Sequence, residues 1–98
     1  MKYLLTLSVL MFSFNAAARD IGNDEASKLA ASGKIQSLDK LNELVLAQHP
    51  NATIHDYELE EEKNRYVYQV ELKDAQGVEW DVEVDATTGA ILENDKDD

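Results

Sequence analysis

The chain contains no cysteine among its 98 residues. This absence excludes disulfide bonds, thiolate catalysis, a Cys-ligated metal and lipid attachment through a cysteine that follows a signal sequence. A small domain without disulfides must be stabilised by packing alone, which is common in bacterial periplasmic domains and less common in small secreted animal domains.

Basic residues are scarce in this sequence. The chain has 9 Lys and Arg against 20 Asp and Glu, which gives a formal net charge of −11. Nucleic acids and anionic membrane surfaces both require a positive patch on the protein that binds them. The composition therefore argues against both ligands.

Histidine is limited to His49 and His55, which lie on either side of the single proline. No HExxH motif or comparable spacing of metal ligands is present, so we expect surface or helix-capping histidines rather than a metal site. Ser27 and Ser37 lack the strand-turn-helix context of a catalytic serine. Acyl transfer is therefore not expected.

Carboxylates are abundant, but their spacing does not indicate acid and base catalysis. Glu71 and Asp81 are expected to oppose each other on two paired strands, as catalytic carboxylates can, yet water on an open face would screen both charges. Four C-terminal acids could attract Ca²⁺ weakly, although they lack the ligand spacing and glycine of an EF-hand. They are Glu93, Asp95, Asp97 and Asp98. We predict no catalytic, metal or cofactor site.

Only one long apolar run is present, from Leu4 to Phe14. It follows Lys2 and precedes small residues that end at Ala18, which is the pattern of a signal peptide. The run is well short of the roughly 20 residues that span a bilayer. We predict a signal peptide at residues 1–18, removed on export to the periplasm or the medium, and no stable membrane anchor afterwards.

Residues 19–93 are predicted to form one domain, followed by an acidic tail at 94–98. The tail has no apolar side chains to bury, so we expect it to be disordered. Removing 18 of the 98 residues would leave 80, and a domain of this size buries only about 60% of its unfolded surface. Function is therefore expected on a face or an edge rather than in a deep cleft.

Apolar and polar residues alternate with a period of two from Tyr66 to Leu92. This pattern predicts antiparallel strands with one buried and one polar face. The loop Ala75-Gln76-Gly77 fits a three-residue hairpin in which Gly77 takes a positive φ. The resulting register pairs Leu72 with Trp80, and we expect Trp80 to anchor the core against the second helix.

Two helices are predicted before the strands. The first is capped by Asn23 or Asp24 after a loose lead at 19–23, and the second is capped by Ser37 and ended by Pro50. The apolar positions of the first strand, 52–60, change parity, which a bulge or a late strand start near Asp56 would explain. The predicted fold is α+β, with the two helices packed on one face of an antiparallel β-meander of three to four strands.

The turns between strands have their own sequence signals. A charged turn is expected at Glu60-Glu61-Glu62-Lys63-Asn64. The last turn is predicted at 86–89, where the carboxylate of Asp85 accepts backbone N–H bonds and Thr88 and Gly89 complete the loop. A four-residue loop pairs Asp85 with Ala90 and turns Ile91 inward beside Val84, whereas Leu92 is expected to face outward.

The same segments resemble the PepSY domain in the form of a small single-domain periplasmic protein. The most specific part is a V-E-V-D-A-x-T-G-x-I-L run at residues 82–92, and P-x-A-x-I at Pro50, Ala52 and Ile54 also matches. The resemblance implies an α+β fold with helix packed on an antiparallel sheet. It also implies a role in restraining peptidases outside the cytoplasm, extrapolated from propeptides of thermolysin-like metalloproteases.

Two function classes follow. The first is a non-catalytic extracytoplasmic domain that binds and restrains a peptidase. The alternative is an accessory domain of a periplasmic sensing system, or an acidic domain that binds cations weakly. In either case the first strand, 52–60, is expected to be a free edge where Glu58 and Glu60 deter self-association and select a basic partner segment.

Overall fold

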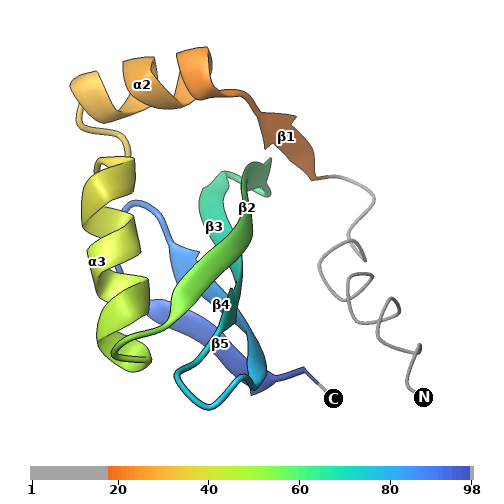
Figure 1. Cartoon of the computed structure of the whole chain (residues 1–98). Coiled ribbons are helices and arrows are strands. Elements are labelled where there is room, and N and C mark those ends of the chain that lie inside the picture. Colours follow the sequence, from red (N-terminus) through yellow and green to blue (C-terminus); the bar gives the residue numbers. More distant parts are fainter. Residues whose placement is uncertain (1–17, 98) are drawn as a thin grey trace.

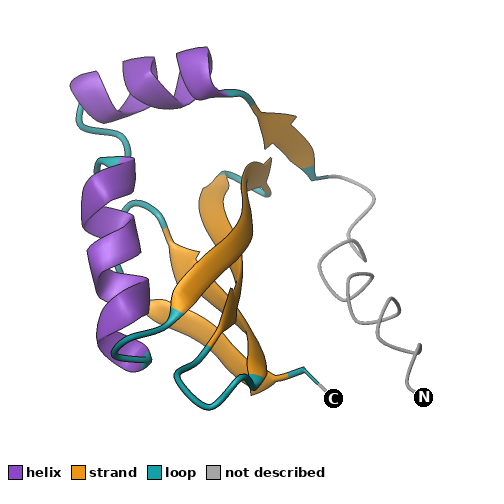
Figure 2. Cartoon of the chain, viewed as in Figure 1, coloured by secondary structure: helices purple, strands orange, loops and turns teal. Residues whose placement is uncertain are grey.

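The computed structural model describes residues 18–97. Two helices and five strands follow one another in this part of the chain (Figures 1 and 2). Their bounds are β1(Arg19–Ile21), α2(Asn23–Ala31), α3(Leu38–Gln48), β2(Thr53–Glu62), β3(Arg65–Lys73), β4(Glu79–Asp85) and β5(Ile91–Lys96). The strands form one antiparallel sheet in the order β1-β2-β3-β4-β5. The fold is α+β as predicted, with five strands instead of three to four.

The strand that the prediction missed is β1, in a segment expected to be a loose lead. It pairs with Leu59 to Glu61 of β2. Two ion pairs fix its start, because the guanidinium of Arg19 lies 3.0 Å from the carboxylate of Glu25 and also contacts Glu61. Ile21 is buried at its other end. A strand of three residues is too short to show a period of two, so its sequence carries no strand signal.

Helix α3 lies along one face of the sheet, whereas α2 extends beyond the end of the strands (Figure 1). Two contacts join α3 to the sheet. The hydroxyl of Tyr68 donates to Asn42 Oδ1 at 2.6 Å, and the rings of His49 and Trp80 have centroids 4.5 Å apart. The predicted packing of α2 on the same face stays a prediction.

The helix ends follow local chemistry, with one exception to the prediction. Ser37 Oγ accepts the backbone N–H of Lys40 at 3.1 Å, which confirms the predicted cap of α3. The predicted side-chain cap of α2 is wrong, because Asn23 is already helical and Gly22 takes the capping position without a side-chain bond. The carboxylates of the first turn face the positive end of the helix dipole instead.

The central hairpin has the predicted register. Leu72 pairs with Trp80, and the loop between β3 and β4 is closed by a 2.8 Å bond from the N–H of Asp74 to the carbonyl of Val78. Gly77 has φ +84°, the conformation that the three-residue loop requires. The alternation of apolar and polar residues was sufficient to predict this register, because a shift of one residue would have moved the apolar side chains to the polar face of the sheet.

Strand β2 confirms the bulge and corrects the turn. The register with β3 shifts between Ile54 and Asp56, which moves the apolar side chains to the other parity. The strand then continues to Glu62, although Glu60 to Glu62 were predicted as part of the turn. Lys63 and Asn64 alone make the turn, both with positive φ, as in a two-residue type I′ hairpin.

The last turn has the predicted four-residue form, but the C-terminal tail does not behave as predicted. The N–H of Asp85 donates to the carbonyl of Ala90 at 2.8 Å, and Ile91 pairs with Val84. Residues from Asn94 onward were expected to be disordered, yet β5 continues through Lys96. This edge strand is held by backbone pairing with β4 rather than by apolar burial, and composition does not show such pairing.

The core combines buried residues of both helices, of the loop between them and of strands β1 to β4. Its buried members are Ile21, Ala26, Ile35, Leu41, Val45, Leu59, Tyr68, Val70, Leu72, Val82, Val84 and Ala86. Trp80 is only partly buried and packs at the margin of this cluster. Its indole N–H donates to Asp74 Oδ2 at 3.0 Å. Leu41 and Leu72, which are fully buried, therefore occupy the centre that was expected for Trp80.

Candidate functional site

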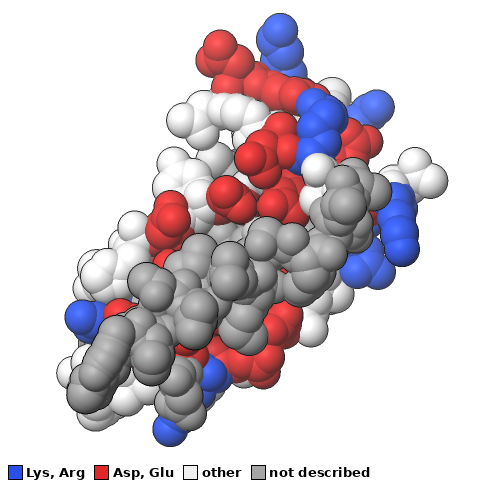
Figure 3. All heavy atoms as spheres, turned by 90° about the vertical axis from the view of Figure 1, so that its right-hand side faces the viewer, with Lys and Arg blue, Asp and Glu red and all other residues white. Residues whose placement is uncertain are grey.

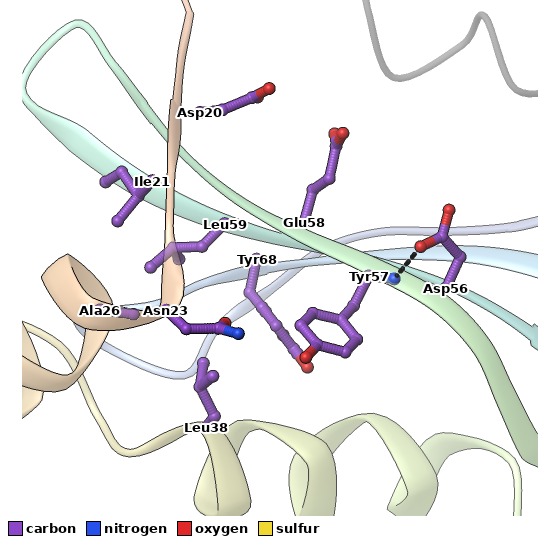
Figure 4. Close-up of a pocket in the computed structure, with 10 residues that line it drawn as sticks. All are labelled: Asp20, Ile21, Asn23, Ala26, Leu38, Asp56, Tyr57, Glu58, Leu59 and Tyr68. Atoms are coloured by element: carbon purple, nitrogen blue, oxygen red, sulfur yellow. Dashed lines mark hydrogen bonds between the residues drawn. The ribbon is translucent and has the colours of Figure 1, made fainter.

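A hollow opens where β1 ends and the chain turns into α2 (Figure 4). We call it the edge pocket. Its volume is about 390 Å³, and it is lined by Asp20, Ile21, Asn23, Ala26, Leu38, Asp56, Tyr57, Glu58, Leu59 and Tyr68. Residues from β1, both helices, β2 and β3 therefore meet at one place beside the sheet's edge.

Tyr57 is the most exposed large apolar side chain of this pocket, with 46% of its surface accessible. Its ring centroid lies 5.9 Å from that of Tyr68, with a tilt of 41° between the planes. The backbone N–H of Tyr57 donates to Asp56 Oδ1 at 2.9 Å. The exposed ring of Tyr57 thus lies next to its own backbone N–H, which is hydrogen-bonded to the neighbouring carboxylate of Asp56.

The floor of the edge pocket is electrically neutral. Burial and, to a smaller extent, the nearby Tyr57 raise the pKa of Tyr68 to about 12, against the opposing effect of the hydrogen bond with Asn42. Tyr68 therefore keeps its proton at ordinary pH and donates it to Asn42 Oδ1. The charges of the pocket are confined to its rim, where Asp20, Asp56 and Glu58 lie.

The two residues that were predicted to bind a partner have different environments. Strand β1 pairs with β2 only at Leu59 to Glu61, so no strand among residues 18–97 pairs with the part of β2 from Thr53 to Glu58 on that side. Glu58 lies at the end of this open part. Glu60 was expected on the open edge, but it pairs with Asp20 and is only 6% exposed. The expected position of Glu60 on a free edge is therefore wrong, because β1 pairs with it, whereas its role in binding a partner stays a prediction.

The sheet face opposite α3 carries mainly carboxylates, and we call it the acidic face. Cross-strand pairing places like charges opposite one another. One row joins Asp56, Glu71, Asp81 and Asp95, and the next joins Glu58, Gln69, Glu83 and Glu93. Figure 3, which views this side of the molecule, shows acidic side chains gathered on it. Such pairs repel each other and destabilise a sheet.

The repulsion changes how protons bind to the acidic face. Burial, with a further contribution from the neighbouring charges of Asp97, Glu71 and Asp95, raises the pKa of Asp81 to about 7. Burial and the adjacent Asp95 and Glu83 likewise raise the pKa of Glu93 to about 7. These carboxyls are protonated at a pH where an ordinary carboxyl is fully charged.

Stability should therefore fall as the pH rises from about 5 to about 8. An aspartate in the unfolded chain has a pKa of about 3.9, whereas that of folded Asp81 is about 7. Between these two pKa values the folded state binds more protons than the unfolded state. The resulting contribution to the free energy of unfolding is complete below the pKa of the unfolded chain and is lost as the pH rises through the pKa of folded Asp81. Denaturant titrations at several pH values measure this slope.

The control for this prediction is Asp81→Asn, which should be more stable than the wild type at pH 8 and show a shallower slope. Below about pH 4 the trend should reverse, because Asp74, which accepts from Trp80 and Val78, has a lowered pKa. A wild-type stability that is unchanged between pH 5 and 8 would contradict the charge repulsion on the acidic face.

The motif residues of the last turn have a structural role. Asp85 Oδ1 accepts the backbone N–H groups of Thr87 at 2.9 Å and Thr88 at 3.1 Å, and Gly89 has φ +83°. Thr87 Oγ1 also donates to the carbonyl of Lys34 at 2.9 Å. The turn is thereby tied to the loop between α2 and α3, which fixes the helix against the sheet.

His49 and His55 do not meet in the structure. The Nε2 of His49 lies 2.8 Å from Asn94 Oδ1, and its ring packs on Trp80, so it joins the end of α3 to β4 and β5. His55 lies at the bulge of β2. The two residues form no shared site.

Sequence reasoning missed three residues of interest. Asp74 accepts the N–H groups of Gln76 and Val78, both at 2.9 Å, as well as the indole of Trp80. Its place just before a loop ending in glycine was a usable signal for such a turn. Tyr57 could have been recognised from the change of parity in β2. No sequence pattern pointed to Asp20, because the three-residue strand β1 that carries it has no recognisable strand pattern.

The fold and the site define a small α+β domain whose polar chemistry consists of carboxylates on a sheet and a pocket beside an open strand edge. Neither helix among residues 18–97 has the length and apolarity that crossing a membrane would require. Residues 35–95 match the PepSY family, described as "Peptidase propeptide and YPEB domain". The chain therefore belongs to the PepSY family, as its motifs indicated. Comparisons with curated proteins and with solved structures each found no match.

Proposed function

We propose that this chain is a non-catalytic domain that acts outside the cytoplasm by binding and restraining a peptidase. The observation that supports this most is the family match over residues 35–95, because the family is described by its occurrence in peptidase propeptides. Residues 1–17 of the predicted signal peptide at 1–18 lie outside the described residues, and removal of this peptide belongs to the proposal. We propose that this restraint occurs between separate chains.

The edge pocket is the proposed contact surface. The open part of β2, from Thr53 to Glu58, offers backbone groups to an extended segment of the partner, and Tyr57 offers an exposed aromatic ring beside it. Aromatic residues of this kind often dominate the binding energy of an interface. The carboxylates on the pocket rim would favour a partner segment that carries Lys or Arg.

The test begins with the capture of periplasmic proteins on the immobilised domain. A peptidase should bind and lose activity, and its affinity should fall with salt, because exposed charges are screened over about 8 Å at physiological ionic strength. Capture of a sensor protein without any peptidase would favour the alternative function. A captured peptidase that keeps its full activity would contradict the restraining role.

Two substitutions locate the contact. Tyr57→Ala should weaken binding of the captured peptidase by about tenfold or more, the effect of losing an aromatic anchor. Leu92→Ala is the matched control, since Leu92 is exposed to a similar extent, 40% against 46%, but lies on β5. Glu58→Lys should weaken binding more than Glu43→Lys, which reverses an exposed charge on α3. Equal losses within either pair would exclude the edge pocket as the contact.

A further inference from the structure

Three carboxylates from two strands converge beside the edge pocket, on the acidic face. Oxygens of Asp20, Glu58 and Glu60 all lie within 4.8 Å of one another. Asp20 and Glu58 lie on the same side of β2, opposite the rings of Tyr57 and Tyr68 (Figure 4). Within the described residues this is the closest grouping of potential ligands for a metal ion. We call it the carboxylate trio.

A separate observation concerns a fourth side chain, Gln69 on β3. Gln69 pairs with Glu58 in the sheet and is only 2% exposed. Its Nε2 donates to Glu60 Oε1 at 3.5 Å, so a half-turn of the terminal amide would bring Oε1 to the carboxylate trio in place of Nε2. Its Oε1 is buried without a hydrogen-bond partner among the described residues. An unpaired buried amide oxygen is costly, and coordination of a cation would satisfy it.

The spacing of the trio selects the kind of ion. Ca²⁺ binds oxygen ligands at about 2.3 to 2.6 Å, so two ligands on opposite sides of it are about 4.6 to 5.2 Å apart. Mg²⁺ requires shorter bonds of about 2.0 to 2.1 Å in strict octahedral geometry. Carboxylate and amide oxygens suit hard cations such as Ca²⁺, whereas softer metals favour thiolates. The chain has no cysteine to supply a thiolate.

We propose that Asp20, Glu58, Glu60 and Gln69 form a binding site for a hard divalent cation of the Ca²⁺ type, which joins β1 to the rest of the sheet. The ion would neutralise three carboxylates that now repel one another, and water would complete its coordination. Because Asp20 is the only ligand from β1, the ion would hold this short strand against β2. The C-terminal acids expected to attract Ca²⁺, including Asp95 and Asp97, lie elsewhere on the acidic face and are not part of this site.

The first measurement is calorimetric titration of the purified protein with CaCl₂. Three carboxylates with an open solvent side resemble extracellular Ca²⁺ modules, so we expect a dissociation constant of about 0.1 to 1 mM. At ten times this concentration the melting temperature should rise by roughly 6 to 11 °C. MgCl₂ should bind at least about tenfold more weakly, because Mg²⁺ demands near-ideal octahedral geometry and gives up its water reluctantly.

Substitutions distinguish this site from general screening of the acidic chain. Glu58→Gln and Asp20→Asn should each weaken Ca²⁺ binding by about tenfold or more, the effect of losing one charged ligand. The matched control is Glu43→Gln, which removes an exposed carboxylate on α3 (73% exposed) and should bind Ca²⁺ as the wild type does. Both site variants remove repulsion, so their folding should be preserved, which circular dichroism can verify.

Three results would overturn the proposal. The first is a heat or thermal shift on adding Ca²⁺ that is equal in the site variants and in the Glu43→Gln control. The second is a shift that NaCl reproduces at equal ionic strength. Either result would show that the ions only screen the acidic chain as a whole. The third is the absence of any heat or thermal shift up to about 10 mM CaCl₂, well above the dissociation constant expected for this ligand set. Equal affinity for Mg²⁺ would contradict the assignment to Ca²⁺.

Discussion

Leu41→Ala should lower the free energy of unfolding by about 3 to 4 kcal/mol, within the range for emptying a leucine site in a core. Leu41 is fully buried and lies on α3, the helix that runs along the sheet. Its removal would leave a cavity between α3 and the strands. A small domain has a total stability of only about 5 kcal/mol, so a large fraction of the variant should be unfolded at room temperature.

Leu92→Ala is the control for this prediction. Both substitutions remove the same atoms, but Leu92 on β5 is 40% exposed, so its loss should cost less than about 1 kcal/mol. Urea titration of both variants gives the two values directly. Equal losses would mean that α3 does not form the main core with the sheet.

Gly89→Ala should be the second most damaging of these changes, at about 2 to 3 kcal/mol. Gly89 has φ +83°, a conformation that costs a residue with a side chain about 1 to 2 kcal/mol. An added Cβ would also lie 2.9 Å from Gln36 Nε2 and 3.0 Å from Leu44 Cδ1. These contacts would push the turn away from α3 and the loop before it, which the turn otherwise holds in place.

Gly77→Ala separates the two causes. Gly77 has nearly the same backbone conformation, φ +84°, but a Cβ there would meet no atom within 4 Å. Its substitution should therefore cost only the backbone part, about 1 kcal/mol. Thermal denaturation of both variants measures the difference. If the two losses are equal, Gln36 and Leu44 move aside without cost and the contact at Gly89 is unimportant.

The sequence was sufficient to predict the hairpins, because alternation and turn residues are both local signals. The pairing of Leu72 with Trp80, the cap at Ser37 and the φ of Gly77 all follow from residues within a few positions of one another. The errors arose where a partner is distant in the sequence. Strand β5 was cut short at Asn94 because its acidic residues indicate solvent, whereas backbone pairing with β4 holds it.

The candidate site was less predictable than the fold. Glu58 and Glu60 were predicted as edge residues because the first strand was assumed to be free along its whole length. Neither the edge pocket nor the carboxylate trio exists without β1, since β1 supplies Asp20 and Ile21 to the former and Asp20 to the latter. A site assembled by a three-residue strand cannot be recognised from periodicity, which requires several repeats to be visible.

The position of β1 also sets the order in which the sheet can assemble. Strands β2 to β5 are joined by short turns, so each can pair with its predecessor as soon as both have formed. Strand β1 must instead close a long loop, because Arg19 and Glu61 are 42 residues apart, and loop closure becomes less favourable as the loop lengthens. We therefore expect β1 to dock last during folding and to open first. Its amides, and those of β2 that it covers, should exchange hydrogen faster than the amides of β3 and β4.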